Sequence, residues 1–184
     1  MIRDLRYYSS PNTADFRPEP LEAMIHDAVS IARTDDGRET RPALKTDVSP
    51  ELRCDVERER FVRALSNLVS NAEQATADDG EIVISAAAVG AEFIDVRVSD
   101  TGRGMSSEEI EQAMERFSTT RREDGGTGLG LPIVQRIVEQ DHSGDLTISS
   151  APGEGTSVTI RIPRTQPRAK EPKNAIAKNT PRRR

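Results

Sequence analysis

Three short segments hold the residues of this chain whose types and spacing could do chemistry together. Two asparagines lie four positions apart in residues 67–71, an aspartate leads a glycine turn at residues 100–104, and alternating glycines fill residues 126–130. Each segment alone is a weak signal. In this order they supply amides, a carboxylate and a glycine-rich loop, which together predict a pocket for a purine nucleotide and its metal ion.

The two asparagines, Asn67 and Asn71, share one face of a predicted helix, because side chains four residues apart lie one above the other. An amide oxygen can bind Mg²⁺, which prefers hard oxygen ligands and keeps several waters beside substrate phosphates. The alternative is a pair of ordinary surface asparagines. Since asparagine is a poor helix former, two of them in mid-helix favour a functional role.

The second segment begins with Asp100 at the end of a predicted strand. Its carboxylate can accept a hydrogen bond from an exocyclic amine such as that of adenine. Gly102 and Gly104 let the backbone turn and approach a flat ligand closely. An ordinary Asp-x-Gly turn is the alternative, and this segment on its own favours that simpler reading.

The third segment places Gly126, Gly128 and Gly130 just before a predicted helix. Free backbone amides and the positive end of the helix dipole make such a junction a phosphate site. The segment lacks the Gly-Lys-Ser/Thr ending of a Walker A loop. Its third glycine also comes too soon for a dinucleotide-binding fingerprint.

Apolar periodicity predicts the elements that must position these segments. Helices are expected over residues 21–32, 55–76, 107–116 and 130–140, with Asp55 as the N-cap of the second. Strands are expected over residues 43–48, 82–86, 93–99, 146–150 and 157–162. Prolines at 11, 18 and 20 are expected to break regular structure before residue 21. The pattern predicts an α/β (two-layer α+β) sandwich, with a mixed sheet of about five strands and three helices on one face.

Composition narrows the class of protein further. The chain has 184 residues, a single cysteine (Cys54) and no run near the roughly 18 apolar residues of a membrane span. We therefore expect a cytoplasmic protein without disulfides and without membrane contact in this chain. Residues 165–184 carry seven basic side chains and one acidic one, although the whole chain has a net charge of −5. The acidic remainder argues against a nucleic-acid-binding fold.

Together the three segments resemble the N, G1 and G2 boxes of the GHKL ATPase superfamily, which includes gyrase B, Hsp90, MutL and sensor histidine kinases. The chain is most similar to the catalytic, ATP-binding (HATPase_c) domain of bacterial two-component sensor histidine kinases. Residues 67–75 resemble the kinase N box, residues 115–121 the F box, and residues 126–134 the G2 box. Arg116 and Ser118 depart from the usual F box, where proline and phenylalanine stand. The resemblance covers roughly residues 18–163 and implies the Bergerat fold.

The resemblance also implies a domain organisation. Residues 1–20 would form a linker that includes a possible remnant of the dimerisation hairpin. Residues 21–163 would form the ATP-binding domain, and residues 164–184 a disordered basic tail. Because the family dimerises through the hairpin, we expect this chain to be a monomer.

ATP and Mg²⁺ are the cofactors that the resemblance implies. Asn71 would hold the metal, Asn67 would lie close to the phosphates, and Asp100 would bind adenine. Gly102 and Gly104 would shape the turn beside the base. Residues 118–127 would close over the triphosphate as a lid, with Arg121 at the terminal phosphate. The remaining nucleotide contacts would come from Gly126, Thr127, Gly128, Leu129 and Gly130.

The amide of Asn67 helps to choose among the branches of the superfamily. Hydrolytic members and anti-sigma serine kinases usually have a glutamate there, which acts as a general base. An amide cannot take up a proton at neutral pH, so this pocket favours phosphoryl transfer to a delivered nucleophile.

The expected function is therefore donation of the γ-phosphoryl group of ATP to a histidine on a separate dimerisation and phosphoacceptor domain, with a response regulator downstream. Neither histidine of this chain fits as the acceptor, because His26 lies in the first predicted helix and His142 is expected to be structural. The alternatives are an ATP-binding regulatory module without an acceptor and, less compatible with Asn67, an anti-sigma-type serine kinase.

Overall fold

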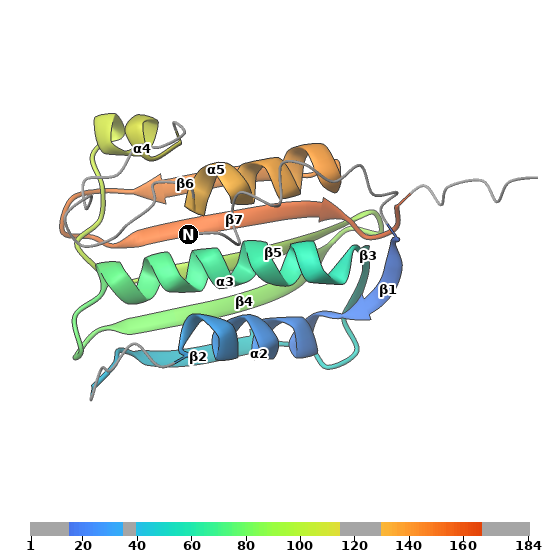
Figure 1. Ribbon diagram of the computed structural model, residues 1–184, viewed down its shortest axis with the longest axis horizontal. Helices are drawn as coiled ribbons and strands as arrows, with labels where there is room; N and C mark the ends of the chain where they lie inside the picture. Colours follow the sequence, from blue (N-terminus) through green and yellow to red (C-terminus); the bar gives the residue numbers. More distant parts are fainter. Residues whose placement is uncertain (1–14, 35–39, 115–129, 167–184) are drawn as a thin grey trace, which may run out of the picture.

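The computed structural model describes residues 15–34, 40–114 and 130–166. A five-stranded sheet has three helices packed on one of its faces (Figure 1). The strands follow the order β2-β4-β5-β7-β6, with bounds Ala43–Val48, Glu81–Val89, Phe93–Asp100, Thr156–Pro163 and Asp145–Ser150. The helices are α2 (Leu21–Ala32), α3 (Arg58–Ala75) and α5 (Gly130–Gln135), which continues into η2 (Arg136–Asp141). The predicted two-layer α/β sandwich is confirmed.

The sheet is mixed because its first two strands are joined by a helix. β2 runs parallel to β4, and the chain between them passes through α3, as a parallel pair requires. The other pairs, β4–β5, β5–β7 and β6–β7, are antiparallel. Gly90, with φ +63°, turns the chain between β4 and β5.

Strand alternation buries only the face that the helices cover. Ile94, Val96 and Val98 of β5 are buried, and the residues between them are exposed or half-buried. On the opposite face, Ser99 and Ser157 lie 3.0 Å apart through their hydroxyl oxygens, and Arg97 donates to Thr159. This polar face explains why all three packed helices lie on one side.

The helices bury the apolar stripes that the sequence predicts. In α3, Phe61, Leu65, Leu68, Val69 and Ala72 are buried, and in α2, Leu21, Met24, Ile25 and Ala28 are buried. α3 packs between α2 and α5, so the side of α3 that faces away from the sheet is the one these elements leave uncovered (Figure 1).

Two short strands were missed, and two expectations about these segments were wrong. Pro18 and Pro20 do not break regular structure but lie in a strand, β1 (Arg17–Pro20), which pairs antiparallel with β3 (Arg53–Val56). This two-stranded ribbon is separate from the main sheet, and proline is tolerated in such edge strands. Asp55 is therefore a strand residue rather than a helix cap, and its buried carboxylate accepts from the backbone N–H of Gln166. The N-cap of α3 is Glu57, whose side chain accepts from the backbone N–H of Arg60.

The last helix also differs from the prediction, because it widens into the π-helix η2 after Gln135. The wider turn ends at His142, which is completely buried between Phe16 and Phe61. The backbone N–H of Glu57 donates to Nε2 of His142, so Nδ1 carries the proton and donates to the carbonyl oxygen of Ile137. His142 is structural, as expected.

The helix predicted to begin at Ser107 is present as α4 (Ser107–Met114), which has no buried residue. Ser106 and Glu109 form a reciprocal capping box at its start. Among the described residues, no helix is both long and apolar enough to cross a lipid bilayer. The expectations for residues 1–14, 115–129 and 167–184 lie outside the described residues.

The burial of His142 makes stability depend on pH. Burial lowers the pKa of His142, with Arg60 acting in the same direction and Asp141 and the Ile137 carbonyl opposing it. The unfolded chain, with a histidine pKa near ~6.5, binds the proton more readily. The contribution of neutral His142 to the free energy of unfolding is therefore fully present above about pH 6.5. It decreases below that pH, by up to about 1.4 kcal/mol per pH unit, until the pKa of His142 in the folded state is reached.

Urea unfolding between pH 7.5 and 5 measures this effect. We expect His142→Gln to be less stable than wild type at pH 7.5, with a difference that shrinks as the pH falls. The exposed His26 provides the control, because His26→Gln should keep the wild-type profile. An unchanged pH profile in His142→Gln would contradict the assignment.

Candidate nucleotide-binding site

Asn67 and Asn71 lie one turn apart on α3, as their spacing predicts. Asn71 is exposed and Asn67 is half-buried. The Nδ2 atom of Asn67 is fully buried, yet it has no hydrogen-bond partner among the described residues. A buried amide donor without a partner carries an energetic penalty, so this atom is a candidate contact for a ligand oxygen.

The start of α5 lies directly against Asn71. A Cβ added to Gly130 would lie 3.4 Å from Oδ1 of Asn71 and 3.5 Å from its Nδ2. The structure therefore brings together the first and third segments, although these two residues lie 59 positions apart in the chain. The first turn of a helix, where backbone N–H groups are unsatisfied, faces an amide that can bind a metal.

Asp100 ends β5 with its carboxylate held by the backbone. Oδ1 accepts from the N–H of Gly102 at 2.9 Å and from the N–H of Thr156 at 3.3 Å. Both of these hydrogen bonds go to the same oxygen, which leaves Oδ2 for a ligand. Burial raises the pKa of Asp100, and the two N–H donors oppose that shift. The carboxylate is thus fixed in direction while one oxygen stays available.

The glycine turn after Asp100 packs against the end of α3. The N–H of Arg103 donates to the carbonyl oxygen of Ala75, and a Cβ at Gly102 would overlap that same oxygen. Only glycine permits this approach, because any side chain would displace the turn from the helix. The contact fixes Asp100 relative to the helix that carries the amides.

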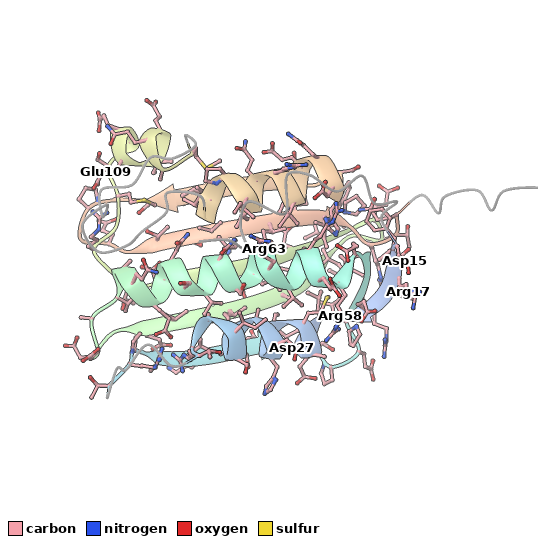
Figure 2. All side chains as sticks on the ribbon, in the orientation of Figure 1. Asp15, Arg17, Asp27, Arg58, Arg63 and Glu109 are labelled. Carbon is pink, nitrogen blue, oxygen red and sulfur yellow. The ribbon has the colours of Figure 1, made fainter. Side chains whose placement is uncertain are left out.

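The turn that carries Gly104 is also held on its other side, by residues 150–153. Gly104 has φ +65°, and a Cβ there would overlap the carbonyl oxygen of Ala151. The N–H of Gly153 donates to the carbonyl oxygen of Arg103, and the N–H of Met105 donates to Oγ of Ser150. Arg103 also pairs with Glu109 of α4 at 2.8 Å, and Figure 2 labels Glu109 at that end of the molecule.

These contacts arrange the site along α3. The aspartate turn lies at Ala75, Asn71 lies one turn earlier beside Gly130, and Asn67 lies one turn earlier again, at a rise of about 6 Å per four residues. The sequence predicted the amides and the aspartate, but it missed Thr156 and Ser150, which hold the turn. The glycines at 153 and 155, both with positive φ, were the available signal for a second tight turn here.

Five of the predicted site residues lie outside the described residues: Arg121, Gly126, Thr127, Gly128 and Leu129. Their proposed roles stay predictions. No cluster of three or more histidine, cysteine, aspartate or glutamate side chains suited to a metal occurs within the described residues. Metal binding here would instead depend on the amide oxygen of Asn71, phosphates and water.

The fold and this layout define the class of protein, a two-layer α/β nucleotide-binding domain. The chain belongs to the family of histidine kinase-, DNA gyrase B- and HSP90-like ATPases, whose model matches residues 56–166. Among solved structures, the catalytic domain of histidine kinase ThkA superposes with a TM-score of 0.71 at 28% identity, covering 83% of this chain and 99% of that domain. The predicted family and the predicted fold are therefore confirmed.

Curated proteins similar to this chain include histidine kinases. The sensor histidine kinase ZraS of Escherichia coli strain K12 is 30% identical over 165 residues, which cover 89% of this chain and 34% of ZraS. The cell-division control histidine kinase PdhS of Brucella canis is 32% identical over 164 residues, 82% of this chain and 16% of PdhS. The chain thus spans about a third or less of these curated relatives.

Two glycines allow a matched test of the locked turns. Gly104 and Gly90 have nearly the same positive φ, but nothing lies within 4 Å of a Cβ at Gly90. We expect Gly90→Ala to lower the free energy of unfolding by about 1–2 kcal/mol through backbone strain alone. Gly104→Ala should lower it by about 1–3 kcal/mol more, because of the overlap with Ala151. Urea unfolding measures both losses, and equal losses would show that the second turn does not constrain the first.

Proposed function

We propose that this chain is the ATP-binding catalytic domain of a two-component sensor histidine kinase. It binds ATP with Mg²⁺ and donates the γ-phosphoryl group to a histidine on a separate dimerisation and phosphoacceptor domain. The observation that carries the proposal is the convergence of Asp100, Asn71 and Gly130 on the C-terminal half of α3. The similarity to histidine kinase catalytic domains supports it.

Each polar group of the site has a role in this proposal. The free oxygen of Asp100 accepts from the exocyclic amine of adenine, and the packed Gly102–Gly104 turn keeps it in place. The buried Nδ2 of Asn67 donates to a phosphate oxygen. The first N–H groups of α5, beginning at Gly130, receive the phosphates, with the family's glycine loop preceding them.

The residues present fit a magnesium ion that is bound mainly by its substrate. Asn71 is exposed and offers one neutral oxygen, while Mg²⁺ usually takes only one or two protein ligands beside phosphates and waters. When bound, the ion would neutralise charge on the phosphates. Asn71 would orient the triphosphate by holding that ion, next to the start of α5.

The site favours transfer over hydrolysis because, among the described residues, the α3 position one turn before the proposed metal ligand holds no proton acceptor. Asn67 occupies the position one turn before Asn71, and an amide cannot activate water as a carboxylate does. Positioning and charge neutralisation then do most of the catalysis, as in other phosphoryl transfers.

The acceptor histidine is proposed to come from another domain. His142 is buried and hydrogen-bonded through both ring nitrogens, and His26 is exposed on α2 beside Asp27. We propose a cytoplasmic location and a response regulator as the downstream partner, by analogy with the sensor kinases that the chain resembles.

Titration calorimetry with ATP, with and without Mg²⁺, tests nucleotide binding. Asp100→Asn should weaken binding about tenfold to a hundredfold, because it replaces an acceptor oxygen with a donor that faces the adenine amine. Asn71→Ala should remove most of the dependence on Mg²⁺. Asp95→Asn is the control, because Asp95 lies on the same strand but pairs with Arg161 on the uncovered face. Unchanged binding by Asp100→Asn would overturn the adenine assignment.

Phosphate release separates a kinase domain from a hydrolase. We expect the isolated chain to release phosphate from ATP at a rate close to the uncatalysed background, since Asn67 cannot deprotonate water. Asn67→Glu should raise the rate, because it supplies the missing general base. Steady release by the wild-type chain that Asn71→Ala abolishes would place the protein among the hydrolytic members of the family.

A further inference from the structure

A buried ion cluster lies on the side of α3 away from α5. Glu73 is only 4% exposed, although it is charged. Its Oε1 accepts from Nε of Arg33 at 2.6 Å and lies 2.5 Å from Nη2 of the same residue. Nη1 of Arg41 lies 3.5 Å from Oε2. Two guanidinium groups from separate segments therefore share one carboxylate of α3.

The cluster also ties the backbone of three segments together. Nη2 of Arg33 donates to the carbonyl oxygen of Pro42 at 2.9 Å, and Nη2 of Arg41 donates to the carbonyl oxygen of Arg33 at 3.2 Å. The hydroxyl of Thr40 donates to the carboxylate of Asp78, just beyond α3. The end of α2, residues 40–42 and the last turn of α3 thus form one connected unit.

Glu73 and Asn71 lie on opposite sides of the same helical turn. Residues two positions apart in an α-helix point about 200° apart around its axis, because each residue adds a rotation of about 100°. Asn71 contacts Gly130 on the α5 side, whereas Glu73 is held on the α2 side. The rotation of α3 about its own axis is therefore fixed from both sides at the turn that carries Asn71.

Stability alone is a weak reason for such a cluster. Burying an ion pair carries a desolvation penalty that often equals its attraction, so apolar residues of similar volume are commonly as stabilising. α2 and α3 are also joined by a more exposed pair at the start of α3, where Arg58 donates to Asp27 at 2.6 Å (Figure 2). The buried cluster adds a defined orientation of α3 relative to α2, because charged hydrogen bonds depend on geometry more strongly than apolar contacts do.

We propose that Glu73 is a positioning residue for Asn71. Its ion cluster with Arg33 and Arg41 sets the rotation of α3, and thereby aims the Asn71 amide at the metal and the phosphates. This inference rests on the proposed function, because it assigns a support to the proposed metal ligand. Glu73 itself makes no contact with the nucleotide.

The test measures ATP affinity of the full chain by calorimetry over a series of Mg²⁺ concentrations, with urea unfolding in parallel. We expect Glu73→Gln to raise the Mg²⁺ concentration needed for half-maximal effect by about tenfold, as loss of a group that supports a metal ligand typically does. Affinity for ATP without metal should change less than twofold.

Because Glu73→Gln leaves buried guanidinium groups without their full partner, a second variant separates stability from positioning. The triple variant Arg33→Met, Arg41→Met, Glu73→Met replaces the whole cluster with apolar side chains. We expect it to recover wild-type stability while keeping the raised Mg²⁺ requirement. A stable triple variant with the wild-type Mg²⁺ requirement would overturn the proposal.

The exposed ion pair between the same helices supplies the matched control. Asp27→Asn weakens the contact of Arg58 at the far end of α3 and should leave the Mg²⁺ requirement unchanged. An equal effect of Asp27→Asn would show that any α2–α3 contact matters equally and would also overturn the proposal. Wild-type protein that binds no ATP at any Mg²⁺ concentration would instead reject the proposed function itself.

Discussion

The site depends first on the close packing of the Asp100–Gly104 turn against the C-terminal end of α3. The carbonyl oxygen of Ala75 accepts from Arg103 at the place where a side chain on Gly102 would lie. This contact joins the end of a strand to the end of a helix at fixed distance. The carboxylate and the amides, which come from different layers of the sandwich, therefore share one frame.

The remaining constraints act on α3 from its two sides. Gly130 allows α5 to begin against the Asn71 amide, and the Glu73 cluster holds the same turn toward α2. The apolar stripe beneath anchors the helix to the sheet but leaves its outer face polar. Within the described residues, the α3 positions that face the start of α5 carry the neutral amide of Asn71 rather than a carboxylate, an arrangement that suits binding and orienting ATP more than activating water.

At the opposite end of the sandwich, His142 contacts both the segment before β1 and the segment after β7. Its ring packs against Phe16 just before β1, and its carbonyl oxygen accepts from the side chain of Gln166. The π-helical turn before it gives the ring the space to reach the N–H of Glu57. Polar groups that lie far apart in the sequence therefore hydrogen-bond to one another at this end of the sandwich.

The sequence alone determined where the main-sheet strands and the packed helices lie along the chain, which residues form the apolar stripes of α2 and α3, and the spacing of the two amides on α3. These features are local, since the spacing of apolar residues along one helix or strand indicates which of its sides is buried. The tertiary structure decided the features that depend on a distant partner. The proline-containing β1 forms because β3 lies beside it. The carboxylate of Asp55 accepts from the backbone N–H of Gln166 instead of capping a helix. Thr156 reaches Asp100 only because β7 pairs with β5, and no local pattern encodes which strand will be the neighbour.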